Sequence, residues 1–262
     1  MTNKQKPLIL ITNDDGVNAK GIKALTEVIR PFGDVVVVAP DKAMSGMSHA
    51  ITVGKPLYIL PLHKEEGCEI YQVSGTPSDC VKLALNEILT RKPDFLVSGI
   101  NHGSNSSVNV HYSGTIGGAR EGAFYGIPSI GFSLLDHDAD ADFTESVKVC
   151  REVFDFVVKN GMEQGVFYNV NIPQGNSVKG IKICRQTMGH WVEEFDKLTD
   201  SSGKTYYRLT GNFINKEPES TDTDEWALKN GYASLVPCST DATCFKTFNQ
   251  LKMENEQDLK IN

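Results

Sequence analysis

The chain has 262 residues, 40% hydrophobic and 23% charged, which is enough to bury the core of one large α/β domain or of a domain with a small appendage. Its net charge of −7 is spread along the sequence without a cluster of lysine and arginine, which argues against binding along a nucleic-acid polymer. No stretch approaches the roughly 18 apolar residues of a membrane span, and the first apolar run is too short for a signal peptide, so we expect a cytoplasmic protein without membrane contact.

The N-terminal part alternates apolar runs with an amphipathic segment. Leu8–Thr12 and Asp34–Ala39 lack polar alternation, which is typical of strands covered on both faces. Between them, Gly21–Arg30 places its apolar residues on one helical face. The order strand, helix, strand predicts a parallel sheet.

The same alternation continues to about residue 160. It predicts helices over Pro77–Leu89, Ile116–Tyr125 and Phe143–Lys159, and strands over Phe95–Ser98 and Ser129–Ser133. We therefore predict an α/β fold in which residues 1–160 form a doubly wound, mostly parallel, Rossmann-like catalytic core.

The pattern changes beyond residue 160. It predicts strands over Phe167–Ile172, Lys179–Cys184 and Thr205–Thr210, and short helices over Asp224–Lys229 and Ala242–Leu251. We expect residues 161–262 to complete the core with a strand and a helix within one overall domain. We also expect them to extend β-hairpins that form subunit contacts.

The six cysteines show neither a CxxC pair nor the spacing of zinc ligands, and most lie in apolar surroundings. Cysteines in such surroundings usually pack as small hydrophobic side chains. We expect reduced, buried thiols in a cytosolic protein, not disulfides.

Three polar loops follow apolar strands in the first half of the chain. NDDG follows the first strand, APDKAMSGMS the second, and NHGSNSSVNVHYSGTIGG the strand that begins at Phe95. The carboxyl ends of parallel strands lie at one edge of an open α/β sheet, where ligands bind. We therefore expect the three loops to meet in space.

NDDG places two carboxylates side by side. At a partly buried strand end they repel each other and raise one pKa unless a cation lies between them. The oxygen donors at this edge, with no cysteine and no paired histidine among them, suit a hard ion such as Mg²⁺ or Mn²⁺; they are Asp14, Asp15, Ser45 and Asn101. The alternative is that one aspartate caps the following helix and the other faces solvent.

YSGT leads directly into the helix predicted at Ile116. Ser113 or Thr115 is a suitable N-cap, and the same helix terminus presents free N–H groups and a positive dipole end to a phosphate. A purely structural cap remains an alternative, but the glycine-rich lead-in on the expected ligand edge favours phosphate binding.

Five blocks together resemble the survival protein SurE family of metal-dependent nucleotidases: NDDGVNAKG, APDKAMSGMSHAIT, SGTPSDCVKLAL, SGINHGSN and YSGTIGGAREG. They occur in the family's order between residues 8 and 135, and TDTDEWALKNGYASLVP resembles its closing strand. The resemblance implies a phosphoric monoester hydrolase that acts on nucleoside 5'- and 3'-monophosphates, and in some members on short polyphosphate. It also implies a homodimer or homotetramer whose subunits exchange C-terminal elements.

The resemblance further implies one divalent ion per subunit, Mg²⁺ or Mn²⁺, held by Asp14, Asp15, Ser45 and Asn101. It implies that the substrate phosphate is held by Asn105 and the turn Ser113, Gly114 and Thr115. Two positions depart from the family's pattern: Ser107 stands where a glycine is frequent, and Arg120 where a small or apolar residue is frequent. They leave the ligands in place but put the loop conformation and the substrate preference in question.

The resulting hypothesis is metal-assisted hydrolysis of a phosphomonoester. Asp14 or Asp15 accepts the proton of the attacking water, while Asn105 and the backbone N–H groups of Gly114 and Thr115 stabilise the phosphoryl oxygens. A covalent variant, in which Asp14 attacks phosphorus, stays open. Two rival functions also stay open: a nucleotide-binding module without turnover, and a nucleotide-sugar transferase.

Overall fold

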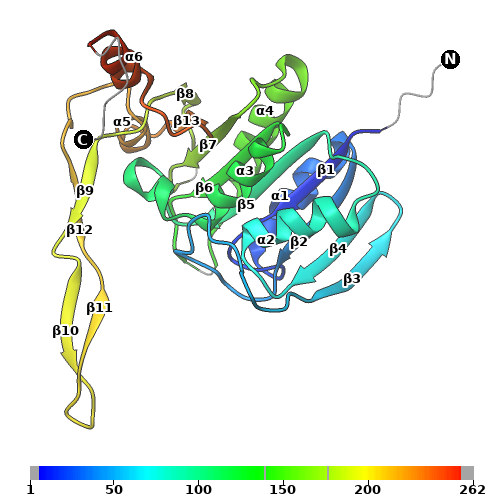
Figure 1. Ribbon diagram of the computed structural model, residues 1–262, viewed down its shortest axis with the longest axis horizontal. Helices are drawn as coiled ribbons and strands as arrows, with labels where there is room; N and C mark the ends of the chain where they lie inside the picture. The colour runs from blue at the N-terminus through cyan, green and yellow to red at the C-terminus, as the bar shows by residue number, and fades with distance from the viewer. Residues whose placement is uncertain (1–5, 139, 176, 255–262) are drawn as a thin grey trace, which may run out of the picture.

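A nine-stranded sheet forms the centre of the computed structural model, which describes residues 6–138, 140–175 and 177–254 (Figure 1). The strand order is β3-β4-β2-β1-β5-β6-β7-β13-β8. These strands are β1 (Leu8–Thr12), β2 (Asp34–Pro40), β3 (Ile59–Glu65), β4 (Cys68–Val73), β5 (Phe95–His102), β6 (Ser129–Leu134), β7 (Val166–Ile172), β8 (Ile181–Ile183) and β13 (Ala233–Ser239). Adjacent strands from β4 to β7 are parallel, whereas β3 and β13 run antiparallel to β4 and β7. The predicted α/β fold with a mostly parallel sheet is confirmed.

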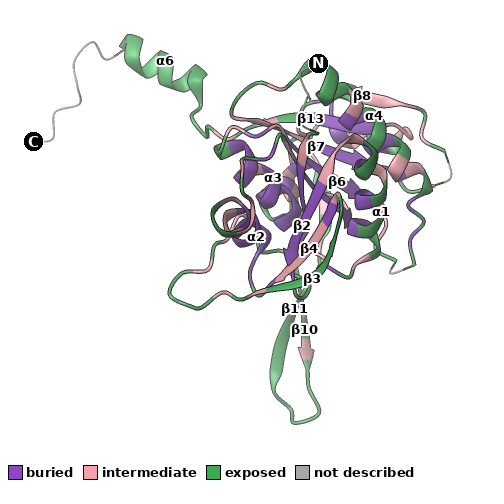
Figure 2. Cartoon of the chain, turned by 90° about the vertical axis from the view of Figure 1, so that its right-hand side faces the viewer, coloured by how far each residue is buried: buried purple, intermediate pink, exposed green. Residues whose placement is uncertain are grey.

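Helices cover both faces of the sheet. They are α1 (Lys20–Ile29), α2 (Pro77–Leu83), α3 (Gly114–Phe124) and α4 (Thr144–Asn160). Successive residues of β1 point to opposite faces: Ile9 and Ile11 join the core cluster that contains α1 and α4, and Leu10 joins the cluster under α2. Burial on both faces explains why the central strands are continuous apolar runs. Figure 2 shows this buried interior in purple.

Most of the predicted elements are present, with ends that shift by a few residues. The helix predicted over Pro77–Leu89 is α2 followed by a wider helical turn at Ala84–Ile88. The sequence patterns do not predict β3 and β4. The edge strand β3 is mostly exposed and contains Pro61, so it lacks the apolar run that marks a buried strand.

After residue 160 the chain first adds β7 to the sheet and then forms an arm, visible as the long hairpin in Figure 1. The arm consists of two antiparallel pairs: β9 (Gly189–Val192) with β12 (Asn212–Asn215), and β10 (Phe195–Thr199) with β11 (Thr205–Leu209). The C-terminal β-hairpins predicted from the sequence are thus present.

The chain then returns through α5 (Asp224–Lys229) and β13 to α6 (Phe245–Glu254). Figure 2 shows α6 lying away from the body and exposed along its length. Among the described helices, none combines the length and the apolar composition needed to cross a bilayer.

The sheet has a topological switch point between β1 and β5. From β1 the chain continues outward to β2 on one side, and β5 then pairs on the other side, with Thr12 opposite Ser98. A switch point opens a crevice at the carboxyl ends of the two strands. The candidate residues after β1 and at the end of β5 therefore lie at the opening of the same crevice.

Candidate active site

Asp14 is the most deeply buried acidic group of the site. Its carboxylate is 3% exposed and accepts a hydrogen bond from the Thr115 hydroxyl, at the start of α3. A Cβ atom on Gly114 would lie 2.9 Å from Asp14 Cβ and 3.0 Å from Oδ2, so only glycine lets the helix terminus approach the carboxylate this closely. Burial, followed by the neighbouring charge of Asp15, raises the pKa of Asp14 to about 6.

Asp15 lies beside Asp14 and is turned toward β5. Its Oδ2 accepts a hydrogen bond of 3.2 Å from the backbone N–H of His102. Burial also raises the pKa of Asp15. The two adjacent carboxylates are thus both held in surroundings that disfavour their charges, as the sequence argument for NDDG expects.

Asn101 lies near the end of β5 and carries the third candidate oxygen. The residue is 8% exposed, and its Nδ2 donates to the Gly103 carbonyl at 2.8 Å. That bond fixes the amide so that its oxygen, an acceptor, points away from Gly103. The next residue, His102, bonds to Asp15, so Asn101 is adjacent to the acidic pair.

The donor set fits a hard divalent cation. The buried carboxylate of Asp14 and the partly buried one of Asp15 lie side by side here. Within the described residues, no three His, Cys, Asp or Glu side chains gather at a metal-binding distance. Oxygen from aspartate, asparagine and serine is the ligand type that Mg²⁺ and Mn²⁺ take, whereas zinc favours nitrogen and sulfur. A cation between the carboxylates would offset the burial of the Asp14 charge and its repulsion by Asp15, the two effects that raise the pKa of Asp14.

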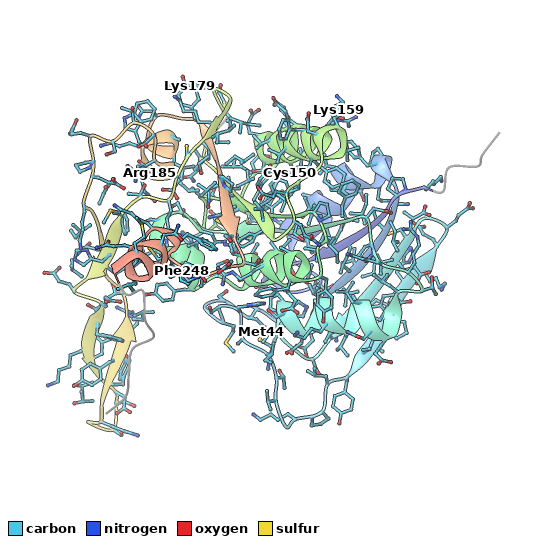
Figure 3. The ribbon with its side chains drawn as sticks, turned by 45° about the horizontal axis from the view of Figure 1, so that its top comes forward. Met44, Cys150, Lys159, Lys179, Arg185 and Phe248 are labelled. Atoms are coloured by element: carbon cyan, nitrogen blue, oxygen red, sulfur yellow. The ribbon has the colours of Figure 1, made fainter. Side chains whose placement is uncertain are left out.

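Ser45 lies on the loop after β2, which Met44 marks in Figure 3. The backbone N–H of Met44 donates to the Asp14 carbonyl at 2.7 Å, so the loop meets the end of β1. Ser45 itself is exposed, and among the described residues no hydrogen bond joins its side chain to the acidic pair. Its backbone is therefore near the site, and its role as a ligand stays a prediction.

A buried glutamate of α3 fixes the Ser45 loop on that helix. Glu121 of α3 is 3% exposed and contacts His49 Nε2 and Lys82 Nζ, each at 2.7 Å. These contacts lower the pKa of Glu121 against the opposing effect of its burial. At Gly117 a Cβ atom would lie 2.4 Å from the Ser48 carbonyl oxygen, so the loop and the helix are in direct backbone contact.

The turn Ser113-Gly114-Thr115 begins α3. Ser113 is the N-cap, and its Oγ accepts from the Ile116 N–H at 3.1 Å. The first N–H groups of a helix have no acceptor within the helix, and they carry the positive end of the helix dipole. The turn is therefore a cap, and its role in binding a phosphate stays a prediction. The Thr115 hydroxyl donates to Asp14.

Asn105 lies at the same edge but in a polar layer at the ends of β6 and β7. Its Nδ2 donates to Ser133 Oγ at 2.7 Å, its backbone N–H to Asn171 Oδ1 at 2.8 Å, and its carbonyl accepts from Asn169 Nδ2 at 2.8 Å. Within the described chain no hydrogen bond joins Asn105 to Asp14 or Thr115. Its proposed contact with a phosphate therefore remains a prediction.

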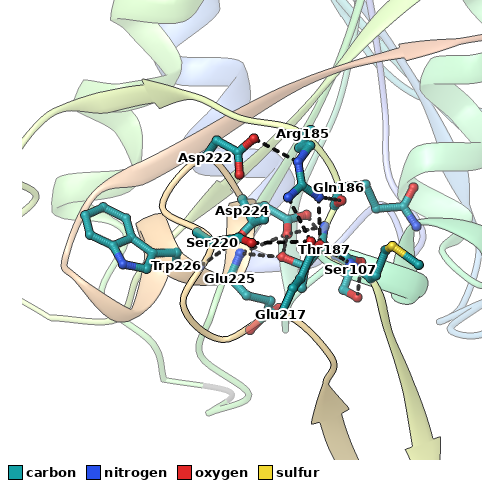
Figure 4. Close-up of polar contacts among 12 residues, drawn as sticks. Ser107, Arg185, Gln186, Thr187, Glu217, Ser220, Asp222, Asp224, Glu225 and Trp226 are labelled. Carbon is teal, nitrogen blue, oxygen red and sulfur yellow. Dashed lines mark hydrogen bonds and ion pairs between the residues drawn. The ribbon is translucent and has the colours of Figure 1, made fainter.

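A second carboxylate network fixes the loop between β5 and α3 (Figure 4). Asp224 is 1% exposed and accepts hydrogen bonds from the backbone N–H groups of Ser107 and Thr187 at 2.8 and 3.0 Å. Ser107 has a φ of 51°, a left-handed conformation that glycine adopts more readily. Its Oγ also donates to the Thr187 carbonyl at 2.9 Å, so these bonds hold a serine in that conformation.

Sequence reasoning singled out Ser107 and Asn105 but not the other residues of these supporting networks. Asn169 and Asn171 carry a signal, because asparagines at alternate positions of the otherwise apolar strand VFYNVNI would be unpaired in a purely apolar core. Glu121 and Asp224 carry no such signal, because their partners are distant in the sequence: His49 is 72 residues from Glu121, and Ser107 is 117 residues from Asp224.

Comparison with known proteins gives one consistent family. Residues 9–193 match the family model described as Survival protein SurE. The chain is 54% identical over 250 residues to the 5'-nucleotidase SurE of Christiangramia forsetii, covering 92% of this chain and 94% of that protein. It is 52% identical to the 5'-nucleotidase SurE of Flavobacterium johnsoniae, with coverage of 94% and 96%. The solved SurE protein from Aquifex aeolicus superimposes with a TM-score of 0.81 at 38% identity, covering 95% of this chain and 99% of that one.

Proposed function

The chain belongs to the survival protein SurE family, and from this premise we propose that it is a phosphoric monoester hydrolase that releases inorganic phosphate from nucleoside 5'-monophosphates. Its relatives at 45% to 54% identity are named 5'-nucleotidase SurE. The proposal extends to nucleoside 3'-monophosphates and short polyphosphate, because the donor groups at this edge address a phosphoryl group and leave the rest of the substrate unspecified.

The observation that carries the proposal is the acidic pair at the switch point, the buried Asp14 and the partly buried Asp15, next to the N-terminus of α3. We assign one Mg²⁺ or Mn²⁺ ion per subunit to the oxygens of Asp14, Asp15, Ser45 and Asn101. When bound, such an ion supplies Lewis-acid polarisation of a phosphoryl oxygen and neutralises charge in the transition state.

The residues of this chain then divide the remaining work. The start of α3 binds the phosphoryl oxygens through the backbone N–H groups at Gly114 and Thr115, with Ser113 ordering the turn. In this proposal the side-chain amide of Asn105, from the polar layer at the ends of β6 and β7, also binds the phosphate. The Thr115 hydroxyl holds one oxygen of Asp14, so the orientation of that carboxylate is set before substrate binds.

Asp14 is our candidate for the proton acceptor. The Thr115 hydroxyl fixes the orientation of its carboxylate before substrate binds, and a carboxylate held in this way can accept a proton from a water beside it. Asp14 takes a proton from the attacking water as the water oxygen bonds to phosphorus, and the bond from phosphorus to the ester oxygen breaks. The ester oxygen takes up a proton from solvent, so the nucleoside leaves as an alcohol, and Asp14 returns its proton to solvent. Asp15 holds the cation together with Asp14 in this proposal.

We also propose a homodimer or homotetramer in the cytoplasm. Two features support self-association: the arm β9–β12 extends from the body with exposed Phe195, Tyr207 and Leu209, and α6 exposes Phe245 and Phe248. The cytoplasmic assignment is supported by the cysteines, all six of which are unpaired, as expected of a reducing compartment.

The test is phosphate release from a panel of nucleoside monophosphates after chelation, followed by re-addition of Mg²⁺ or Mn²⁺. We expect activity to vanish on chelation and to return with either ion. Tight nucleotide binding without phosphate release would identify a binding module instead. Transfer to an acceptor only in the presence of a nucleotide-sugar would identify a transferase.

A further inference from the structure

A cavity of about 670 Å³ lies beside the acidic site, between the core and the arm. Its lining includes Gly46, Asn109, Tyr112, Trp191, Leu209 and Gly211. Two of these are aromatic and one is aliphatic, and the volume lies within the range of small-molecule sites, about 300 to 1,000 Å³. The proposed metal ligands do not line this cavity, and Glu194 is the charged residue among those that do. The cavity is therefore a separate place from the proposed metal site.

Trp191 is held in a fixed orientation. Its indole N–H donates to Asn109 Oδ1 at 2.9 Å, and its ring packs edge-to-face on Phe213 with centroids 5.8 Å apart. Gly211, between β11 and β12, lies close to the ring: a Cβ atom there would be 3.3 Å from Trp191 Cε3. These contacts fix the orientation of the indole ring, and Trp191 lines the cavity.

Tyr112 joins the cavity to the proposed phosphate site. It immediately precedes Ser113, the N-cap of α3, and its carbonyl accepts from the Ser48 N–H at 2.9 Å. Its side chain is 56% exposed. Gly46, also in the lining, follows Ser45. Because consecutive Cα atoms are about 3.8 Å apart, Tyr112 and Gly46 each lie one residue from a group assigned to phosphate or metal.

We propose that this cavity binds the nucleobase of the substrate, with the rings of Tyr112 and Trp191 as its stacking surfaces. The inference rests on the proposed function, because it assigns a binding site to the base of a nucleotide whose phosphate is bound at the acidic site. A base stacks on aromatic rings through its π-face, which every base has. We therefore expect selection for nucleotides over other phosphate esters, with tolerance among the bases.

The arm gains a role from this assignment. Trp191 belongs to β9 and Leu209 to β11, so one wall of the base site is built by the arm and the other by the loop before α3. The catalytic groups, by contrast, lie entirely on the core sheet edge. Substitutions in the cavity should therefore change the recognition of the base without changing the chemistry at phosphorus.

Tryptophan fluorescence measures base binding without turnover. The chain has two tryptophans, and Trp226 lies elsewhere, under Lys182, so Trp226→Phe leaves Trp191 as the sole reporter. We expect adenosine, added in the presence of a metal chelator, to quench this emission. The excitation wavelength is set at the long-wavelength edge of tryptophan absorption, where adenine does not absorb. Ribose 5-phosphate should leave the emission unchanged. Absence of quenching by adenosine, or equal quenching by both compounds, would overturn the assignment.

Kinetics then separates base recognition from catalysis. We expect Tyr112→Leu to lower kcat/KM for adenosine 5'-monophosphate about 5- to 100-fold, the range for loss of one base–aromatic stack, and to leave kcat/KM for ribose 5-phosphate within about twofold. Tyr112→Phe should retain both values, and Tyr207→Leu, which removes an exposed tyrosine of the arm outside the cavity lining, is the matched control.

Equal losses of Tyr112→Leu on both substrates, or no loss on either, would reject the base site while the hydrolase assignment stands. A wild-type protein that released phosphate from neither substrate would instead contradict the proposed function. The adenosine titration would in that case still decide whether the cavity binds a base.

Discussion

The sheet edge around Asp14 buries polar side chains, whereas the arm β9–β12 exposes large apolar ones. At the edge, polar groups are buried and hydrogen-bonded: Asp14, Asn105 and Thr115 are each at most 5% exposed. In the arm, large apolar groups are exposed: Phe195 is 64% and Leu209 70% exposed. Both arrangements cost free energy in an isolated chain. The proposed partners, a cation and a phosphate at the edge and another protein surface at the arm, would offset these costs.

The difference also separates rigid from adaptable parts of the molecule. The edge is fixed by three networks, centred on Thr115, Glu121 and Asp224, that connect α3, the Ser45 loop and the loop before α3. The outer part of the arm is held mainly by its own strand pairing. Substitutions at the edge should therefore change activity strongly, and substitutions in the outer arm should leave the chemistry intact.

The largest effect is expected from Asp14→Asn or Asp15→Asn. Removing either charge weakens the hold on the cation and, at Asp14, removes the proton acceptor, so kcat should fall at least about 10²-fold with the fold intact. Steady-state phosphate release and circular dichroism measure the two quantities. Asp41→Asn, an exposed aspartate after β2, is the control; wild-type turnover in Asp14→Asn would show that the metal site is misplaced.

Stability should change in the opposite direction from activity. The pKa of Asp14 is raised from 3.8 to about 6 in the folded state, so the folded protein binds this proton more tightly than the unfolded chain does. Stability of the metal-free protein should therefore fall as pH rises from about 4 to about 6 and level off above. At pH 8, Asp14→Asn should raise the free energy of unfolding by about 1 to 3 kcal/mol.

Urea denaturation of the chelated proteins at several pH values measures this difference. The gain from Asp14→Asn should shrink toward pH 4, where the wild-type carboxyl is protonated. A variant that is less stable than wild type at pH 8 would show that the buried charge is compensated within the chain itself.

A smaller effect is expected from Thr115→Ala. The hydroxyl donates one hydrogen bond to the Asp14 carboxylate and so orients a proposed metal ligand. Its loss should therefore weaken phosphate binding through that ligand, by roughly 1 to 2 kcal/mol. The inhibition constant for inorganic phosphate is the measurement, and Thr115→Ser, which keeps the hydroxyl, is the matched variant. An unchanged inhibition constant in Thr115→Ala would exclude a role for this side chain.

The smallest effect on catalysis is expected from the outer arm. Tyr207→Ser removes an exposed aromatic ring of β11 that is 64% exposed and should leave kcat for each active site within about twofold, while it weakens association between subunits. Size-exclusion chromatography with light scattering measures the mass. An unchanged mass in Tyr207→Ser, and in a second variant Phe195→Ser, would argue against the arm as a subunit contact.

Sequence patterns predict the sheet and the approximate site because both depend on local signals. Continuous apolar runs mark β1, β2 and β6, and the carboxyl-edge rule brings NDDG, the Ser45 loop and YSGT together without any coordinates. The edge strand β3 lacks such a signal, since exposure and Pro61 remove its apolar pattern.

The supporting contacts could not be predicted, because they join residues far apart in the sequence. Nothing local in the sequence pairs Asp224 with the Ser107 N–H, or Glu121 with Lys82 and His49. The unusual serine at position 107 is a case in point: the sequence raises the question of its loop conformation, and the contacts with Asp224 and Thr187 explain how a non-glycine residue holds a positive φ.

The most direct measurement is the position of a bound ion in crystals grown with Mn²⁺, located by its anomalous scattering. We predict one manganese peak per chain, within coordination distance of carboxylate oxygens from Asp14 and Asp15 and of the Asn101 amide oxygen. A fully active enzyme whose crystals place manganese elsewhere, or show none between the two aspartates, would contradict the assignment.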